Sequence, residues 1–376
     1  MNIVEFDSYF SNYNHSYQEN AMIAELDPIK SDADIVQLPY MNCARDIKSI
    51  ISRLQRLIPT EGQIEDFNIH EARAVVRDLG MFAGSIKKYG IEPVEVIPQL
   101  ETVLIQLGTK TDMVPRDTLI HYTVWNPDGE RKRRYTLHLD ETKIIESSKI
   151  AIPRLEMGIY KLLELHKIPF ESPDFIRECE ICASYLNGMV EAIVYTIKNV
   201  SRKVFAENLR PYFDSFMIQG KEYLGPGAVE MPLLIFDHFL WSSECRDVAY
   251  LYFKQSFISY FLPNFRKLYI DGVFATSLLS KLIDKLNNAS SFDENLVASA
   301  AELMKLFKIL IKFRKPHIKV VNQAYTQAEN RQRETGSGGY KCSTLIHITE
   351  LTENAVASLQ NAIKEHEILH NHMMIS

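Results

Sequence analysis

A mainly α-helical fold is predicted, a helical bundle with a smaller N-terminal helical part that carries one β-hairpin. Two observations predict it. Apolar residues recur every three to four positions over most of the chain, which is the period of an amphipathic helix. A run of β-branched and aromatic residues beside a turn motif is found at a single place. The 376 residues, 46% of them hydrophobic and 24% charged, are enough for a large globular core.

The N-terminal elements follow in order. Residues 1–40 are polar and aromatic without a helical period, so we expect an irregular arm. A helical period is expected from Cys43, with a stripe of isoleucine and leucine that ends at Pro59, and further helices are expected near 69–89 and 92–107. Residues 118–125 and 134–139 are then expected to pair as a hairpin around the Asn-Pro-Asp-Gly turn at 126–129. A lone hairpin is marginal in water, so it should pack against helices.

Beyond residue 140 nearly every segment has a helical pattern. The regions 173–200 and 228–262 are apolar on more than one face, which is typical of central helices in a bundle. We therefore divide the chain into an N-terminal cover, 1–140, and an all-α domain, 141–376. The helices expected in that domain span about 144–167, 173–200, 228–243, 246–262, 271–287, 293–314, 317–332 and 341–370.

Composition excludes several classes of protein. The net charge of -6 argues against a nucleic-acid partner, and the basic run at 130–134 is interpreted as a solvated hairpin edge. No segment has the roughly 18 apolar residues of a membrane helix, and no secretory signal is expected at the N-terminus. The five scattered cysteines suggest reduced thiols and a cytoplasmic protein, with Cys179 and Cys182 buried in a helix. The histidines near the C-terminus, 366, 370 and 372, are interpreted as a solvated, fraying face.

His317 is the candidate metal ligand. It follows a thick apolar face at 303–313 and comes directly after Pro316, which should kink a helix or begin a new one. A neutral imidazole among hydrocarbon side chains suits the axial ligand of a haem iron. A structural core histidine is the alternative reading of the same pattern. Arg314, one turn before it, could pair a haem propionate or be a plain surface charge.

A glycine-rich loop follows this helix. Tyr325 lies eight residues after His317, about 12 Å further along a helix. The loop at 336–340, Gly-Ser-Gly-Gly-Tyr, lets the backbone approach a ligand closely, although a flexible linker is the alternative. It is not a nucleotide-binding motif, because it neither ends in Gly-Lys-Ser/Thr nor follows a strand.

The order of histidine helix, hydroxyl residue, Gly-Ser-Gly-Gly loop and final helix resembles the indoleamine and tryptophan 2,3-dioxygenase superfamily of haem enzymes. Two further segments narrow the resemblance to one branch of this superfamily. They are Asn-Leu-Arg-Pro-Tyr-Phe at 208–213 and Tyr-Leu-Gly-Pro-Gly-Ala-Val-Glu-Met-Pro at 223–232. They look like the monodechloroaminopyrrolnitrin synthase branch, which rearranges a chlorinated tryptophan. The resemblance covers roughly residues 140–370, and the N-terminal part is placed by analogy.

The resemblance implies a haem b site inside the bundle and a role for each matching residue. His317 would be the proximal ligand of the iron, and Tyr325 and Ser337 would hold the substrate carboxylate. Gly336, Gly338 and Gly339 would form the loop that closes over the substrate. The helix expected over 228–241 would supply the distal wall, with its ligand-facing residues drawn from Leu233, Phe236 and Asp237.

Two acidic residues complete the predicted site. Glu230 and Asp237 lie seven residues apart, on one face of the expected helix, which suits a proton relay. A helix cap and a hydrogen-bonded core acid explain them nearly as well. The predicted function is a haem-dependent oxidation of L-tryptophan or a similar amino acid by O2 or peroxide, in a possible homodimer. The alternatives are an aromatic amino-acid hydroxylase, a haem sensor, and a haem-free helical interaction module.

Overall fold

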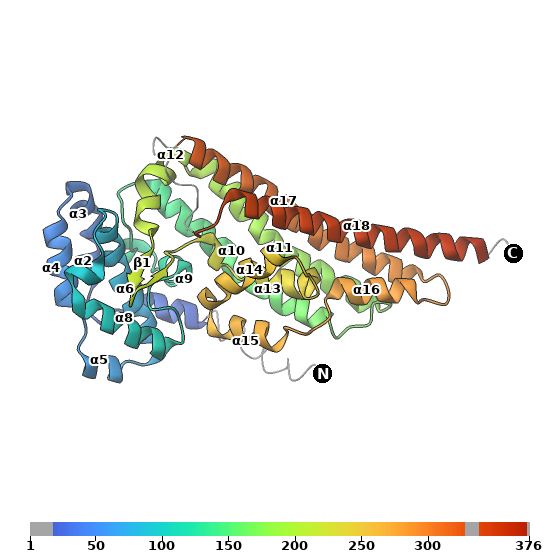
Figure 1. Ribbon diagram of the computed structural model, residues 1–376, viewed down its shortest axis with the longest axis horizontal. Coiled ribbons are helices and arrows are strands. Elements are labelled where there is room, and N and C mark those ends of the chain that lie inside the picture. The colour runs from blue at the N-terminus through green and yellow to red at the C-terminus, as the bar shows by residue number, and fades with distance from the viewer. Residues whose placement is uncertain (1–17, 328–337, 374–376) are drawn as a thin grey trace.

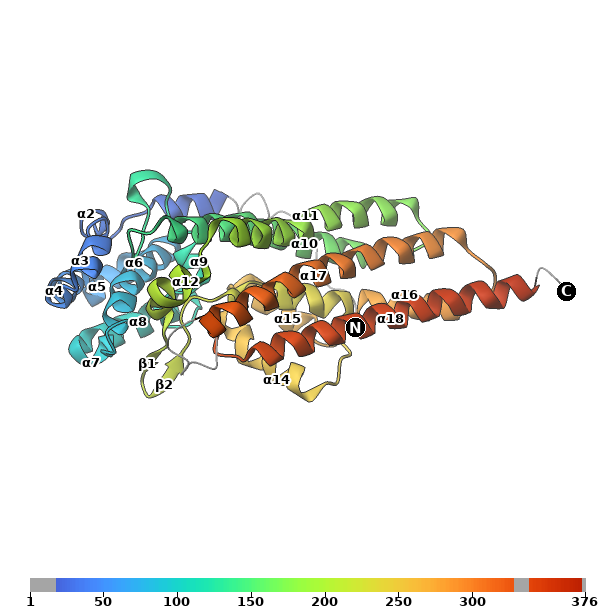
Figure 2. The same cartoon turned by 90° about the horizontal axis from the view of Figure 1, so that it is seen from above.

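The computed structural model describes residues 18–327 and 338–373 and is built almost entirely of helices. Four long helices lie along one another in an elongated bundle: α10 (Leu139–Leu165), α11 (Pro173–Asn199), α17 (Glu294–Gln327) and α18 (Cys342–Met373) (Figures 1 and 2). α10 packs along α11, α11 against α17, and α17 against α18. The predicted mainly α fold is confirmed.

Shorter helices close the bundle on one side. They are α13 (Leu233–Asp237), α14 (Val248–Phe257), α15 (Pro263–Asp271) and α16 (Leu278–Asn287), and α16 packs against α18. The bundle core is continuous across these elements and includes Phe236, Leu282, Leu303, Phe307 and Leu359, all fully buried. Burial of such apolar surface is the main stabilising contribution to the bundle.

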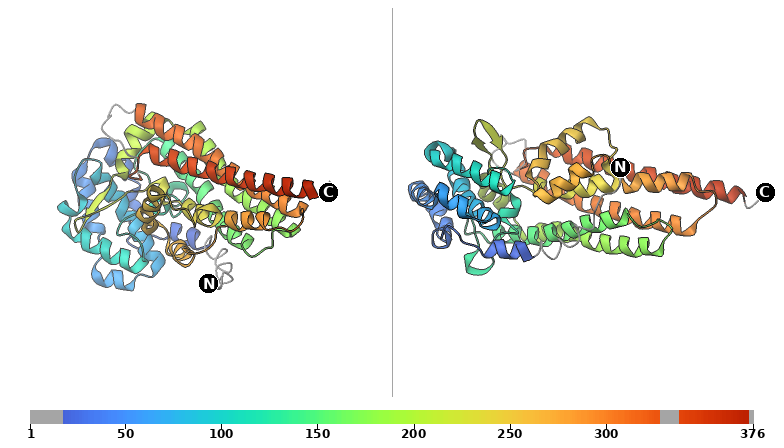
Figure 3. Two further views of the ribbon diagram at one scale, coloured as in Figure 1. Left: turned by 45° about the vertical axis from the view of Figure 1, so that its right-hand side comes forward. Right: turned by 90° about the horizontal axis from the view of Figure 1, so that it is seen from below.

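A second core lies at the other end of the molecule (Figure 3). Its helices are α2 (Asp32–Ile35), α3 (Leu38–Ala44), α4 (Ile47–Leu57), α5 (Glu61–Asp66), α6 (Ile69–Lys87), α7 (Pro93–Val96) and α8 (Pro98–Thr111). It also takes in Ile145 and the buried side chains of 209–218, far along the chain. The N-terminal core is therefore built from two separate stretches of sequence, and the boundary near residue 140 stays a prediction.

The expected irregular arm is wrong for much of the part that the structure describes. Residues 18–25 form a helix, and α2 and the start of α3 follow, while residues 1–17 lie outside the described part. Arg77 explains the order of this segment. Its buried guanidinium donates to the carbonyl oxygens of Ile23, Ala24 and Leu26 at 2.7–3.2 Å, so it satisfies the free carbonyls at the end of the helix.

The hairpin expected from 118–125 and 134–139 is also wrong. Residues Leu119–Tyr122 form the short helix α9, and a single 3-10 turn at Gly129–Arg131 follows. Side chains take the backbone groups that a hairpin would have paired. The carboxylate of Glu141 accepts from the amides of Tyr135 and Thr136 at 2.6 and 2.7 Å, and Asn126 bonds both backbone groups of Arg133.

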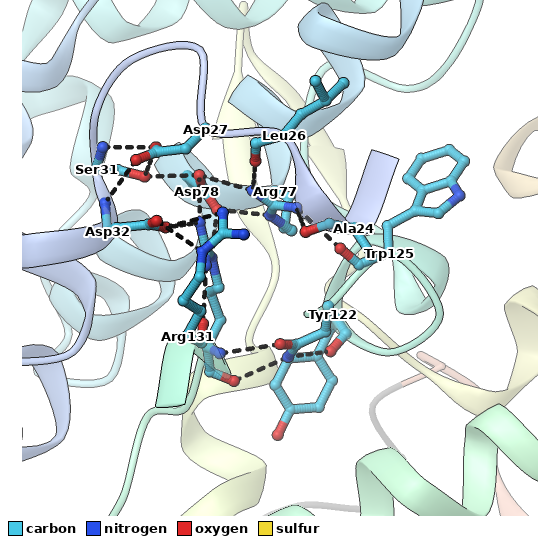
Figure 4. A network of polar contacts seen from close by, with 12 residues as sticks. Ala24, Leu26, Asp27, Ser31, Asp32, Arg77, Asp78, Tyr122, Trp125 and Arg131 are labelled. Atoms are coloured by element: carbon cyan, nitrogen blue, oxygen red, sulfur yellow. Dashed lines mark hydrogen bonds and ion pairs between the residues drawn. The ribbon is translucent and has the colours of Figure 1, made fainter. Parts of the chain in front are cut away.

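The basic run at 130–134 is not a solvated edge. Arg133 is fully buried and contacts Asp78 and Asp32, and Arg131 donates to Asp32 at 2.7 Å. Figure 4 shows Arg77, Asp78, Asp32 and Arg131 meeting in this network. Burial alone would raise the pKa of Asp78, but the guanidiniums of Arg77 and Arg133 hold it well below its usual value. Ion pairs of this basic run therefore connect the segment after α9 to α6, and the run does not serve as a charged surface for a partner.

A small hairpin does occur, elsewhere in the chain. β1 (Phe216–Ile218) pairs antiparallel with β2 (Lys221–Tyr223). Gln219 and Gly220 form the two-residue turn, with φ of 48° and 70°. Such turns favour glycine because they need positive φ. The segment is too short to have shown a period of two, which is why the sequence pattern did not reveal it.

Two further helix boundaries differ from expectation. α17 runs without interruption through Pro316, because its packing between α11 and α18 outweighs the roughly 3 kcal/mol cost of an interior proline. The helix expected over 228–243 is instead a 3-10 turn, Ala228–Glu230, then α13, then the π-helical turn His238–Ser242. Within the described residues, no helix is long and apolar enough to cross a membrane.

Candidate cofactor and substrate site

A large, mostly apolar cavity lies where α10, α11 and α17 converge with the segment 226–231. Its volume is about 220 Å³. His317 lines it from α17, and Gly338 and Tyr340 line it from the residues just before α18. The apolar walls include Leu119, Ile144, Ala151, Met189, Ile193, Phe205, Phe213, Met231, Phe313 and Val321. A concave apolar site with few polar groups is what a flat, hydrophobic ligand requires.

A second cavity of about 70 Å³ lies next to the first. Met189, Ala228, Met231, Phe313, His317 and Tyr340 line both. Asp237, Tyr250 and Arg314 belong to the smaller cavity, as does Leu233. The imidazole of His317 therefore lies at the boundary between the two cavities, where it can contact a ligand in either one.

His317 is a partly buried histidine beside both cavities. Its ring stacks on Phe313 with centroids 5.4 Å apart and planes 20° apart. Among the residues that the structure describes, neither ring nitrogen has a hydrogen-bond partner. Burial, and then the nearby Arg314, lower the pKa of His317 to about 4. The imidazole is therefore neutral near pH 7, the form that coordinates metals.

Arg314 and Asp237 form a buried ion pair behind this histidine. Arg314 donates from one guanidinium nitrogen to Asp237 and from another to the Thr352 hydroxyl at 2.6 Å. Asp237 also accepts from the Trp241 indole at 3.1 Å and the Tyr250 hydroxyl at 3.3 Å. The pair joins α17 to α13 and α18 one helical turn from His317, so Arg314 is not a surface charge.

Glu230 lies apart from Asp237, so the expectation that they share one helix face is wrong. Pro232 follows the 3-10 turn that carries Glu230, and a new helix begins at Leu233. The Glu230 carboxylate accepts from the Leu119 amide, and its second oxygen has no partner among the described residues. It faces a third cavity of about 20 Å³, which Glu156 also lines. Burial raises the pKa of Glu230 well above its usual value and that of Glu156 to about 8.

Glu156→Gln should stabilise the protein more at high pH than at low pH. The folded state holds a proton on Glu156 up to about pH 8, whereas the unfolded chain releases it near 4.5, so wild-type stability falls as the pH rises through this window. We expect the stability gained by the glutamine variant to grow by about 2–4 kcal/mol between pH 5 and pH 8 in urea unfolding. Glu191→Gln, on the surface of α11, is the control; equal pH trends in both variants would contradict the buried neutral acid.

The other predicted site residues divide into three groups. Gly338 lines the large cavity, and a Cβ there would come within 2.5 Å of the Tyr340 ring and 2.9 Å of Val229. Gly339 has a φ of 70°, which favours glycine. Phe236 is fully buried and lines neither of the cavities beside His317. Gly336, Ser337 and the side chain of Tyr325 lie outside the described residues, although the backbone at 325 belongs to α17.

A comparison with known protein families addresses the whole chain. The family model described as monodechloroaminopyrrolnitrin synthase PrnB matches residues 19–371. The chain belongs to this family. The monodechloroaminopyrrolnitrin synthase family lies within the haem superfamily of the tryptophan and indoleamine dioxygenases, so the resemblance inferred from the sequence is confirmed. It extends over the N-terminal part as well, which the sequence motifs did not cover.

The residues present fit the haem that this family uses. The unpartnered, neutral imidazole of His317 faces a large apolar cavity, which is the environment that a porphyrin and its axial ligand require. Among the described residues, no three His, Cys, Asp or Glu side chains gather as a separate metal site. Cys179 and Cys182 are buried thiols, and burial raises the pKa of Cys179 to about 12, as expected for inert sulfur. His366 is buried rather than solvated and contacts the carbonyl of Leu286 at 3.0 Å.

Several residues that line the cavities were not predicted from the sequence. Tyr340 lines both cavities beside His317, and its ring packs edge-on against Phe253 and Phe257. Its position directly after Gly338 and Gly339 is a sequence signal that could have identified it. Arg202 lines the large cavity with the hydroxyl residues of α10 and α11. No local motif marks Arg202, because it reaches the cavity through the packing of distant helices.

Proposed function

We propose that this protein is a haem b enzyme that oxidises L-tryptophan or a ring-substituted tryptophan-like amino acid. The observation that carries the proposal is the unpartnered imidazole of His317 at the wall of a large apolar cavity. Membership of the monodechloroaminopyrrolnitrin synthase family supports it independently. When bound, the haem supplies the chemistry of O2 or peroxide.

The residues of the chain bind the haem and the amino acid, orient them and enclose them. His317 holds the iron, and the apolar walls exclude water and favour a flat aromatic ring, whose stacking adds about 0.5–1.5 kcal/mol beyond burial. Tyr325 and Ser337 hold the amino-acid carboxylate, and Gly336, Gly338 and Gly339 form the closing loop. Leu233 shapes the smaller cavity, and Phe236 supports that wall from within the core.

The acidic residues have different roles in this proposal. Asp237 orients Arg314, and with it the turn of α17 that carries His317, rather than exchanging protons with Glu230. Glu230, neutral through burial, holds a proton close to the Leu119 backbone, whose side chain lines the large cavity. Arg314 is a positioning residue rather than a propionate partner, since Asp237 and Thr352 already occupy its guanidinium.

Spectroscopy with an amino-acid panel tests the function. We expect the purified protein to bind one haem per chain with a Soret band, and tryptophan to perturb that band at lower concentration than tyrosine, phenylalanine or histidine. Indole should bind more weakly than tryptophan, because it lacks the carboxylate. Oxygen- or peroxide-dependent loss of tryptophan, followed by mass spectrometry, then separates an enzyme from a haem sensor.

Each failure points to a different alternative. A preference for tyrosine would favour an aromatic hydroxylase, and haem binding without turnover of any aromatic amino acid would favour a sensor. A protein that binds no haem would favour the haem-free helical module. A cytoplasmic location and a homodimer remain proposals, to be tested by fractionation and by the mass of the protein in solution.

A further inference from the structure

Part of the wall of the large cavity is polar. Arg202, on the short helix α12 (Arg202–Val204), lines the cavity, as do Ser147 and Ser148 of α10 and Thr196 of α11. The three hydroxyls already donate to backbone carbonyls or to one another: Ser147 to Ala192 at 3.0 Å, for example. Among the described residues that line this cavity, Arg202 is the one formally charged side chain.

Arg202 has no counterion among the residues that the structure describes. It makes no ion pair and no hydrogen bond with any of them. Lys203 lies 4.0 Å from Glu207, which has one buried carboxylate oxygen without a partner among the described residues, and Asp140 accepts from the Ser201 amide at 2.6 Å. Arg202 is partly exposed at the cavity wall, and its guanidinium offers five N–H donors to an anionic ligand there.

The surroundings fix Arg202 relative to the cavity. Ser201 caps α12, since its hydroxyl accepts from the Val204 amide at 3.4 Å, and its own amide is held by Asp140 at the start of α10. α12 packs against α17, the helix of His317, and Phe205 of the following turn lines the same cavity. The Arg202 side chain therefore forms part of the cavity wall.

We propose that Arg202 binds a carboxylate of the molecule that occupies the large cavity. The inference rests on the proposed function, which supplies two such groups: a propionate of the haem and the carboxylate of the amino acid. Both are planar anions that a guanidinium can bind with two parallel hydrogen bonds. The anion would then lie beside Arg202, and the apolar side chains of the wall would contact the ring.

The first experiment compares Arg202→Gln with Lys203→Gln, which removes a neighbouring cation that does not line the cavity. Affinity is measured for ferric protohaem and for its dimethyl ester, in which both propionates are uncharged. If a propionate is the anion, Arg202→Gln should weaken protohaem binding by about 10–100-fold and leave the ester unchanged. Arg202→Lys should recover part of the loss, and Lys203→Gln should behave as wild type.

The second experiment uses the same variants loaded with haem and titrates tryptophan against tryptamine, which has no carboxylate. If the amino-acid carboxylate is the anion, Arg202→Gln should weaken tryptophan binding by about 10–100-fold and spare tryptamine. Unfolding in urea checks that the variants retain the wild-type fold.

Either selective loss supports the inference and names the source of the carboxylate. A folded Arg202→Gln variant that binds protohaem and tryptophan within about threefold of wild type would overturn it, while leaving the proposed function intact. Wild-type protein that binds no haem would instead overturn the proposed function, and the inference with it, so the two failures are distinguishable.

Discussion

His317→Ala is expected to lower haem affinity by more than about 100-fold, because removing even a partner of a metal ligand costs 10–100-fold. The variant should keep its helical content, since the side chain packs mainly on Phe313 and faces the cavities. Haem titration followed at the Soret band, beside far-UV circular dichroism, measures both effects. Added imidazole should restore part of the spectrum by entering the space that the side chain leaves.

Two other histidines provide controls for this result. His238 is buried and bonds the carbonyl of Gly272 at 2.9 Å, and His347 bonds Asp247 at 2.9 Å. Neither lines the cavities beside His317. His238→Ala and His347→Ala should therefore retain haem. The assignment of the ligand is wrong if His317→Ala holds stoichiometric haem with an unchanged spectrum while one of these variants loses it.

Asp237→Ala should destabilise the apoprotein by about 3–5 kcal/mol, the usual cost of leaving one partner of a buried ion pair alone. The change also removes the acceptor of the Trp241 indole and the Tyr250 hydroxyl. Urea unfolding measures the free energy. Replacing both partners, as in Asp237→Leu with Arg314→Met, should recover most of the loss, because no unpaired charge then remains in the interior.

The neighbouring pair between Lys315 of α17 and Glu353 of α18 is the control, since Lys315 directly follows Arg314 along α17. Its atoms are 2.7 Å apart, but the side chains are 62% and 43% exposed. Glu353→Ala should therefore cost less than about 1 kcal/mol. Equal losses of unfolding free energy in Asp237→Ala and Glu353→Ala would show that burial does not increase the contribution of the Asp237–Arg314 pair to stability.

The long helices were predictable because their apolar period extends over many turns, and α4, α6, α10, α11 and α18 lie close to the expected ranges. The hairpin at 118–139 was not, because side chains within and just after this segment bond its backbone. Glu141 and Asn126 take its backbone groups, and the Thr118 side chain pairs with His121 to begin a helix. Strand propensity is a weak guide wherever side-chain hydrogen bonds compete for the same backbone.

The site was predictable where its residues follow one another along the chain. His317 and Gly338 line one cavity, as the order of histidine helix and glycine loop suggested. Arg202 and Glu156 could not be found this way. Helix packing brings Arg202 to the large cavity and Glu156 to the third cavity, and neither lies in a motif. A single sequence carries the chemistry of each side chain but not which distant elements face it.

The N-terminal core includes side chains from residues 209–218, and this has a consequence for synthesis on the ribosome. The helices before residue 140 cannot complete their packing until the chain is about 80 residues longer. At 5–20 residues per second, that delay is roughly 4–16 s. During it, the apolar faces of α6 and α7 that later contact this segment stay uncovered, which makes the nascent chain a substrate for chaperones. A fragment ending near residue 140 should accordingly aggregate, whereas one extended past residue 218 should remain in solution.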